Sequence, residues 1–346
     1  MNAISVAVIG PYKSGKTSLV NKLQQRKEQR REVEGDVSFF SFRYGGRDVN
    51  LIDTPGDVDA PTLIASSLCI SDAVMLCIAA DSGINFQLGE LVVLTDSLRI
   101  KNGLVCMTKV DTATAADIDK IKSNLSLLFK GTTLESFAII ETNINNDQTI
   151  ADLRAKIAGF SYDQSKISMP FRLAIDGAFE SKGSTIAVGT LLSGKISIHT
   201  DAIIAPTPFT KEISLSSVQV NQADVQSAEA GDRASVALKG VWPWDLPRGV
   251  EIRQPKSFKD LKSGTIRANV NKLYKFDISD GSRFTLVCNW QSTEITLSAV
   301  KREGNQLTAN FASEKNICFD VNDRMILINK DLPIRTLRVI GRAEAL

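Results

Sequence analysis

The segment GPYKSGKT occupies residues 10–17 and directly follows the apolar run ISVAVI at residues 4–9. The pattern GxxxxGK[ST], placed after a strand and before a helix, is typical of a loop that wraps around phosphates. Its glycines let backbone N–H groups converge on a phosphate, and the N-terminus of the next helix adds a partial positive charge. Lys16 would reach the β and γ oxygens, and Thr17 would offer a hydroxyl to Mg²⁺. The alternative is a tight strand-to-helix turn whose glycines serve packing alone.

Apolar runs and amphipathic segments alternate through about residue 160. Strands are expected at 4–9, 37–42, 49–53, 73–80, 103–109 and 137–141, and helices at 17–25, 87–100, 115–129 and 149–160. This alternation predicts an α/β P-loop domain with a mostly parallel sheet.

The second half of the chain shows a different pattern. Residues 160–170, FSYDQSKISMP, are polar, end in proline and predict a linker. Short β-branched stretches with Gly, Asn and Asp turns follow, without a helical pattern, and favour two all-β barrel domains that meet around residues 247–264. The predicted domains are therefore 1–163, 168–253 and 258–346.

Composition excludes several classes of protein. The chain has 346 residues and a formal net charge of +2, so the overall charge indicates neither nucleic acid nor membrane as a partner, although the C-terminal two thirds are mildly basic. The five cysteines are widely spaced, without CxxC, and only His199 could add an imidazole, which favours buried thiols over zinc or disulfides. With no leader-like start and no long apolar stretch, we expect a cytoplasmic monomer with no membrane contact.

Two further motifs lie at the ends of predicted strands. In LIDTPGD, residues 51–57, Asp53 is placed to hold Mg²⁺ and the amide of Gly56 can follow a γ-phosphate. In CMTKVD, residues 106–111, the TKxD form resembles the motif that reads guanine, with Asp111 accepting from the base. The order of the three motifs favours guanine over adenine. The predicted nucleotide-binding residues are Gly10, Lys13, Ser14, Gly15, Lys16, Thr17, Ser18, Gly56, Thr108, Lys109 and Asp111, with Thr142 or Asn143 in a weaker last motif, and the predicted metal ligands are Thr17 and Asp53.

The sequence resembles the translational GTPases of the elongation factor Tu type. Four segments carry this resemblance: residues 70–87, 171–196, 216–241 and 337–346. The sequence of residues 171–196 is similar to that of the selenocysteine-specific factors of the SelB type. The resemblance implies an α/β P-loop GTPase domain followed by two barrels, with GTP or GDP and Mg²⁺ as ligands. It also implies tRNA or aminoacyl-tRNA and the ribosome as partners. Because the SelB type carries a fourth domain, we expect the sequence ending at Leu346 to lack one.

In this family the second domain contacts the aminoacylated 3′ end of tRNA. The resemblance therefore implies an aminoacyl pocket with Asp176, Phe179 and Arg233, and the alternative is a pair of charges that satisfy turns at a barrel rim. Trp242 and Trp244 could stack a terminal adenine, although tryptophans beside a turn more often seal the end of a barrel.

Three positions depart from the family pattern. Lys13 stands where an acidic residue helps to bind a monovalent cation, so its ammonium either replaces that cation or points into solvent. Val37 stands where a threonine senses the γ-phosphate, and Ser38, one residue later, is expected to point the other way. Asp57 stands where the catalytic histidine lies, and a carboxylate about 5 Å from a γ-phosphate charge costs roughly 3 kcal/mol. We therefore predict very slow hydrolysis, with Lys16 and Asp57 as the catalytic residues.

Two other functions stay open at this point. The chain could be a scaffold that binds RNA or protein without nucleotide, which the missing switch threonine and catalytic histidine favour and the retained Lys16, Thr17 and Asp53 oppose. It could also be a GTPase subunit that regulates a metabolic enzyme, as in the sulfate-activating relatives of this family.

Overall fold

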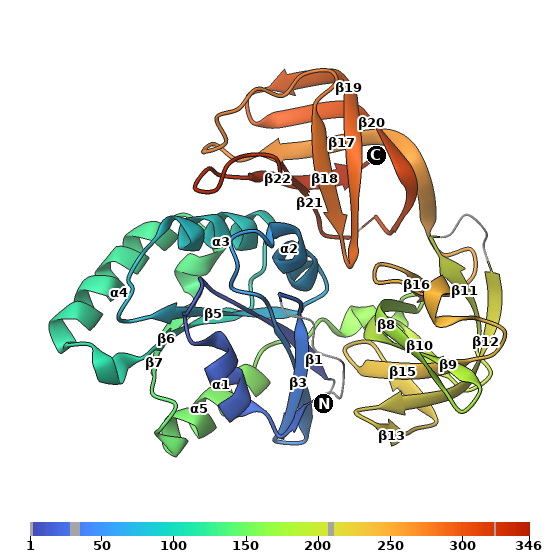
Figure 1. Cartoon of the computed structure of the whole chain (residues 1–346), viewed down its shortest axis with the longest axis horizontal. Helices are drawn as coiled ribbons and strands as arrows, with labels where there is room; N and C mark the ends of the chain where they lie inside the picture. Colours follow the sequence, from blue (N-terminus) through green and yellow to red (C-terminus); the bar gives the residue numbers. More distant parts are fainter. Residues whose placement is uncertain (1–2, 28–34, 207–210, 322) are drawn as a thin grey trace.

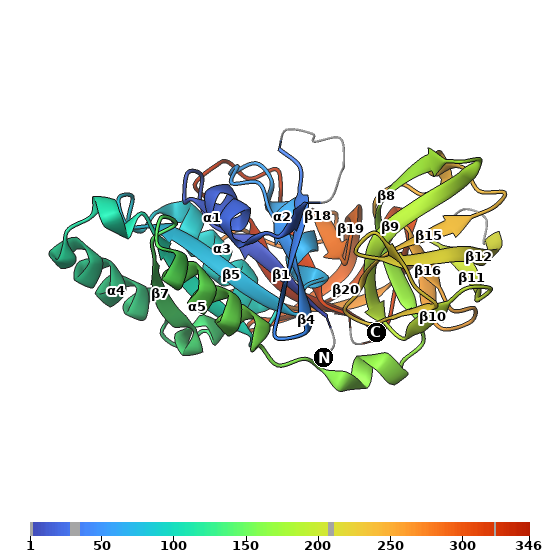
Figure 2. The same cartoon turned by 90° about the horizontal axis from the view of Figure 1, so that it is seen from below.

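A computed structural model describes residues 3–27, 35–206, 211–321 and 323–346. It consists of an α/β part and two β-barrels, and each of the three contacts the other two (Figure 1). Figure 2 shows the α/β part and the first barrel side by side, joined by the segment that contains the short 3-10 helix η3 (Gln164–Ser168).

The α/β part is built on a seven-stranded sheet in the order β2-β3-β4-β1-β5-β6-β7. The strands are β1 (Ile4–Ile9), β2 (Arg26–Lys27), β3 (Ser38–Tyr44), β4 (Arg47–Asp53), β5 (Ala73–Ala79), β6 (Gly103–Thr108) and β7 (Ala138–Thr142). The five strands from β4 to β7 along the sheet are parallel, and β2 and β3 form an antiparallel edge. The predicted mostly parallel sheet is confirmed.

Helices cover both faces of this sheet. They are α1 (Lys16–Leu23), α2 (Pro61–Cys69), α3 (Phe86–Ser97), α4 (Ala115–Phe129) and α5 (Asp147–Ala158), with 3-10 helices η1 (Val110–Thr112) and η2 (Thr133–Ser136). Apolar residues of α1 and α5 pack on one face, and those of α2, α3 and α4 pack on the other. Helix α2 was not predicted, because it is short and buried on nearly all sides and therefore shows no amphipathic pattern.

The first barrel closes through six antiparallel strands, because β11 pairs with both β16 and β12. These strands are β8 (Arg172–Ser181), β9 (Ser184–Ser193), β11 (Asp201–Ala205), β12 (Lys211–Val220), β15 (Arg233–Leu238) and β16 (Glu251–Arg253). Strand β13 (Ala223–Asp224) extends one edge, β10 (Lys195–Ser197) pairs with β14 (Ser227–Glu229), and the 3-10 helix η4 (Pro243–Asp245) follows β15.

The second barrel is closed in the order β17-β20-β19-β18-β21-β22. Its strands are β17 (Lys259–Val270), β18 (Arg283–Cys288), β19 (Gln291–Glu303), β20 (Gln306–Phe319), β21 (Met325–Ile328) and β22 (Val339–Ala345). Two barrels after an α/β domain are the predicted architecture. Of the helices in the described ranges, none combines the length and the apolar character that crossing a membrane requires.

The second barrel docks on helices α2 and α3. Its residues Val287 and Ile326 belong to the same buried apolar cluster as residues of those helices. The buried guanidinium of Arg338 lies 2.6 Å from Oε2 of Glu90 in α3 and donates to the carbonyl oxygen of Val58 at 2.6 Å. The segment that contains Asp57 is thereby attached to this barrel.

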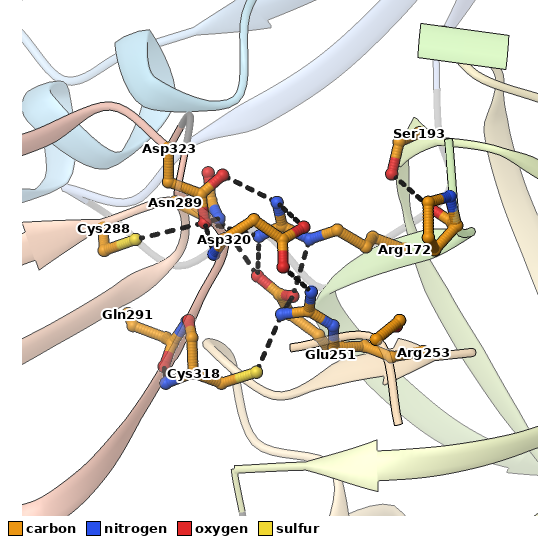
Figure 3. A network of polar contacts seen from close by, with 12 residues as sticks. Arg172, Ser193, Glu251, Arg253, Cys288, Asn289, Gln291, Cys318, Asp320 and Asp323 are labelled. Atoms are coloured by element: carbon orange, nitrogen blue, oxygen red, sulfur yellow. Dashed lines mark hydrogen bonds and ion pairs between the residues drawn. The ribbon is translucent and has the colours of Figure 1, made fainter. Parts of the chain in front are cut away.

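A charged network joins the two barrels (Figure 3). Arg172 of the first barrel lies 3.2 Å from Glu251 and 2.6 Å from Asp323 of the second. Arg253 lies 3.1 Å from Glu251 and 2.5 Å from Asp320 of the second barrel. Burial raises the pKa of Asp323, but the charge and hydrogen bond of Arg172, the backbone N–H of Asp320 and the charge of Arg253 together outweigh it and lower the pKa of that carboxyl. The buried charges are thus paired across the junction, as buried charges must be.

Candidate functional site

A cleft of about 1020 Å³ opens where β1 and β4 end. It is lined by Tyr12, Lys13, Ser14, Gly15, Lys16, Thr17, Ser18, Asn21, Gly35, Asp36, Ser38, Phe40, Asp53, Thr54, Pro55, Gly56, Asp57 and Lys109. Ligands of open α/β sheets bind at the carboxyl ends of the strands, which is where this cleft lies.

The loop before α1 is held in a defined shape. Gly15 has a φ of +80°, and a Cβ atom there would lie 3.0 Å from Oγ1 of Thr108, so only glycine fits. The same Thr108 hydroxyl donates to the carbonyl oxygen of Ser14 at 2.7 Å and ties the loop to β6. Nζ of Lys16 donates to the carbonyl oxygens of Gly10 at 2.8 Å and Pro11 at 3.0 Å, and burial lowers the pKa of this lysine.

Asp53 is the most unusual group in the cleft. The hydroxyl of Thr17 donates to Oδ2 of Asp53 at 2.8 Å, while the buried Oδ1 has no hydrogen-bond partner among the described residues. Burial raises the pKa of Asp53 to about 6, against the opposing effects of Thr17 and Lys16. A buried carboxylate oxygen without a partner, beside a hydroxyl, fits the oxygen ligands that Mg²⁺ prefers.

Ser38 faces this cleft, so the prediction that it points the other way is wrong. It lies opposite Asp53 in the antiparallel pair β3–β4, and directly opposed residues project to the same side. Val37 instead turns toward the barrels, where it is buried with Phe39 and Trp290. A serine hydroxyl is therefore available beside Thr17 and Asp53, although the threonine position itself holds valine.

Lys13 and Asp57 both line the cleft and are exposed. Nζ of Lys13 lies 5.4 Å from the ring centroid of Tyr12. Gln87 of α3 connects the two loops, because its Oε1 accepts from the backbone N–H of Tyr12 at 3.2 Å and its Nε2 donates to the carbonyl oxygen of Gly56 at 2.8 Å. Sequence reasoning missed Gln87, since no motif marks it and only the fold brings α3 beside both loops.

The residues predicted to read the base lie at the ends of β6 and β7. Lys109 lines the cleft and forms an ion pair with Asp81 at 2.8 Å, whereas Asp111 is exposed in η1. The hydroxyl of Thr142 donates to the carbonyl oxygen of Ile140, and Oδ1 of Asn143 accepts from the backbone of Asn145. The lining of the cleft includes Lys109 but not Thr108, Asp111, Thr142 or Asn143, whose roles stay predictions.

A second cavity of about 580 Å³ lies between β3–β4 and the first barrel. Phe179 and Arg233, two of the three residues predicted for the aminoacyl pocket, line it. The third, Asp176, is buried and forms a two-pronged ion pair with Arg233 at 2.7 and 2.9 Å. The guanidinium carbon of Arg233 lies 3.5 Å from the ring centroid of Phe39, so the pair is fixed against β3.

Comparisons with known proteins agree with this architecture. Residues 24–219 match the family described as "Elongation factor Tu GTP binding domain". The selenocysteine-specific elongation factor of Methanocaldococcus jannaschii is 25% identical over 378 aligned residues, which cover 100% of this chain and 80% of that protein. The corresponding factor of Desulfomicrobium baculatum is 27% identical over 73% of this chain and 41% of its own length. The crystal structure of the translation elongation factor SelB of Methanococcus maripaludis with the GTP analogue GppNHp has a TM-score of 0.87 at 20% identity and covers 99% of this chain and 78% of that one.

Proposed function

Because the chain belongs to the family of the elongation factor Tu GTP binding domain, we propose that it binds GTP and GDP together with Mg²⁺. One observation carries the proposal. Oδ1 of Asp53, which no described residue hydrogen-bonds, lies at one end of the cleft together with the hydroxyl of Thr17 and the buried ammonium of Lys16. A turn kept for packing alone has no reason to bury a carboxylate and an ammonium there, since each is costly to remove from water.

Each residue has a proposed role. Thr17 and Asp53 hold Mg²⁺, which when bound neutralises charge on the β and γ phosphates. Lys16 exchanges the loop carbonyls for phosphate oxygens, and the hydroxyl of Ser38 serves in place of the missing threonine. Asp111 and Lys109 select guanine. Ser14, Gly15 and Ser18 surround the phosphates with backbone and hydroxyl donors.

Hydrolysis is proposed to be very slow. Asp57 lies in the cleft at the position of the family histidine, and its negative charge repels the γ-phosphate. A penalty of roughly 3 kcal/mol lowers a rate on the order of a hundredfold. Lys13 supplies a positive charge in the same loop, and we propose that it takes the place of a monovalent cation.

We further propose that the chain engages tRNA or aminoacyl-tRNA as a relative of the SelB type. The second cavity, with Phe179 and the Asp176–Arg233 pair, supports a site for an aminoacyl end between the α/β part and the first barrel. The proposed domains remain 1–163, 168–253 and 258–346.

Titration with fluorescent GDP and with a non-hydrolysable GTP analogue, with and without Mg²⁺, tests the nucleotide proposal. We expect Mg²⁺-dependent binding of both, lost in Thr17→Ala and kept in the matched hydroxyl control Ser123→Ala, which lies on α4. Absence of binding at high micromolar concentrations would overturn the proposal in favour of the nucleotide-independent scaffold. Co-purification of a metabolic enzyme instead of RNA would favour the regulatory subunit.

A further inference from the structure

The loop after β15 carries two tryptophans that stack on each other in solvent. The ring centroids of Trp242 and Trp244 are 5.0 Å apart, and their planes differ by 8°. Their exposed fractions are 53% and 72%. They do not seal the barrel, because Val241 and Leu246, on either side of them, fill its core instead. The pair thus presents a large aromatic surface that the described fold does not use.

The loop holds this surface in a fixed shape. Asp245 accepts from the backbone N–H of Trp242 at 3.0 Å, and its own N–H donates to the carbonyl oxygen of Trp242 at 2.9 Å. The hydroxyl of Thr185 in β9 donates to the carbonyl oxygen of Val241 at 2.6 Å. With both ends of the loop buried, little conformational entropy remains to be lost when a ligand stacks on the rings.

The charges around the rings are mainly positive. Lys239 is exposed two residues before the buried Val241, and Nζ of Lys211 donates to the carbonyl oxygen of Gly240. The only carboxylate of residues 239–246 is Asp245, which lies 4.0 Å from Lys211 and already caps the turn. Two ammonium groups beside a flat aromatic surface complement a phosphodiester chain with unstacked bases.

We propose that Trp242 and Trp244 form a stacking platform for unpaired nucleotides of an RNA strand, with Lys211 and Lys239 contacting its phosphates. A protein partner would need a broader apolar surface than two rings, and the neighbours of the rings in the sequence include glycine, proline and lysine. Strand β15 lines the second cavity as far as Ala237 and leads directly into this loop, so a single strand that leaves the cavity along β15 reaches the rings. The platform does not depend on nucleotide in the first cleft.

Fluorescence anisotropy with the full chain and a labelled single-stranded RNA hexamer tests this proposal, with the duplex of the same sequence as a second probe. We expect the single strand to bind more tightly than the duplex and Trp244→Ala to weaken it at least about fivefold. Trp244→Phe keeps most of the affinity because it keeps a stacking face. Leu273→Ala, which removes another exposed apolar side chain in the second barrel, serves as the matched control and changes nothing.

Several results would overturn the proposal. One is that the wild type and Trp244→Ala bind the hexamer with equal affinity, and another is that Trp244→Phe loses as much affinity as Trp244→Ala. A third is that the hexamer does not bind at about 100 µM, the weak limit of non-specific association. If the wild type self-associates and Trp244→Ala abolishes that association, the partner of the two rings is a second copy of the chain and not RNA. If GDP fails to bind while hexamer binding still depends on Trp244, the proposed nucleotide binding is refuted and the proposed stacking platform is supported.

Discussion

Replacing Asp53 by asparagine should stabilise the nucleotide-free protein and at the same time abolish its Mg²⁺-dependent binding of nucleotide. The carboxylate is buried, one of its oxygens has no partner among the described residues, and Thr17 binds the other. Asparagine keeps an acceptor for Thr17 and removes the charge. The carboxylate that suits the metal therefore destabilises the folded, metal-free chain.

The shift of the pKa of Asp53 from 3.8 to about 6 sets the size of the effect. Between these two values the folded protein binds more protons than the unfolded chain, so the free energy of unfolding falls as the pH rises. The loss amounts to about 3 kcal/mol once the pH exceeds the folded value, and to roughly half of that near pH 5. Asp53→Asn removes this loss, so its advantage should shrink as the pH falls.

Urea unfolding in the presence of EDTA, at about pH 5 and about pH 7, measures the free energy of unfolding of both proteins. Asp57→Asn, which removes an exposed carboxylate of the same cleft, is the matched control and should leave stability unchanged. Adding Mg²⁺ and GDP should stabilise the wild type but not Asp53→Asn. An Asp53→Asn protein that is no more stable than the wild type at pH 7, or whose advantage does not vary with pH, would refute the reasoning.

Four further changes test other parts of the structure. Asp36 of the α/β part and Arg248 of the first barrel form a two-pronged ion pair at 2.6 and 2.8 Å. Reversing either charge alone should lower the affinity for the GTP analogue severalfold, and reversing both should restore that affinity in the same titration. Asp111→Asn should bind guanine nucleotides more weakly and xanthine nucleotides more tightly, because the asparagine amide can donate to the second xanthine oxygen. Competition binding measures both affinities. Asp57→His should accelerate GTP hydrolysis on the order of a hundredfold in a phosphate-release assay, and an unchanged rate would contradict the repulsion argument. Arg172→Met should lower the free energy of unfolding by about 3–5 kcal/mol, measured with urea, since it leaves the carboxylate of Asp323 without its ion pair.

The phosphate-binding loop could be predicted because its chemistry is local. Eight consecutive residues contain the glycines, the lysine and the threonine, and the apolar run before them identifies the strand. The α/β part could be predicted for the same reason, because the alternation of strand and helix patterns is also visible in short stretches of sequence. Helix α2 could not be predicted, because a helix buried on nearly all sides lacks the repeat of polar and apolar residues that marks an amphipathic helix.

Features that depend on distant pairing could not be predicted. The orientation of Ser38 follows from its pairing with Asp53 and from the burial of Val37 against the barrels, neither of which the local sequence reveals. The Asp36–Arg248 pair joins residues 212 positions apart. Gln87 connects Tyr12 with Gly56 only because α3 packs beside two loops from other parts of the chain.

The network of Arg172, Glu251 and Arg253 has a mechanical consequence. Separating the two barrels would expose the buried side chains of Arg172, Glu251 and Arg253 together with the carboxylates of Asp320 and Asp323. Among the described residues, Asp36–Arg248 pairs the α/β part with the first barrel and Glu90–Arg338 pairs it with the second. We therefore expect the two barrels to move as one unit relative to the α/β part. Arg338 links this unit to the segment beside Asp57, because it donates to the carbonyl oxygen of Val58. A shift of that segment should therefore be transmitted to both barrels together.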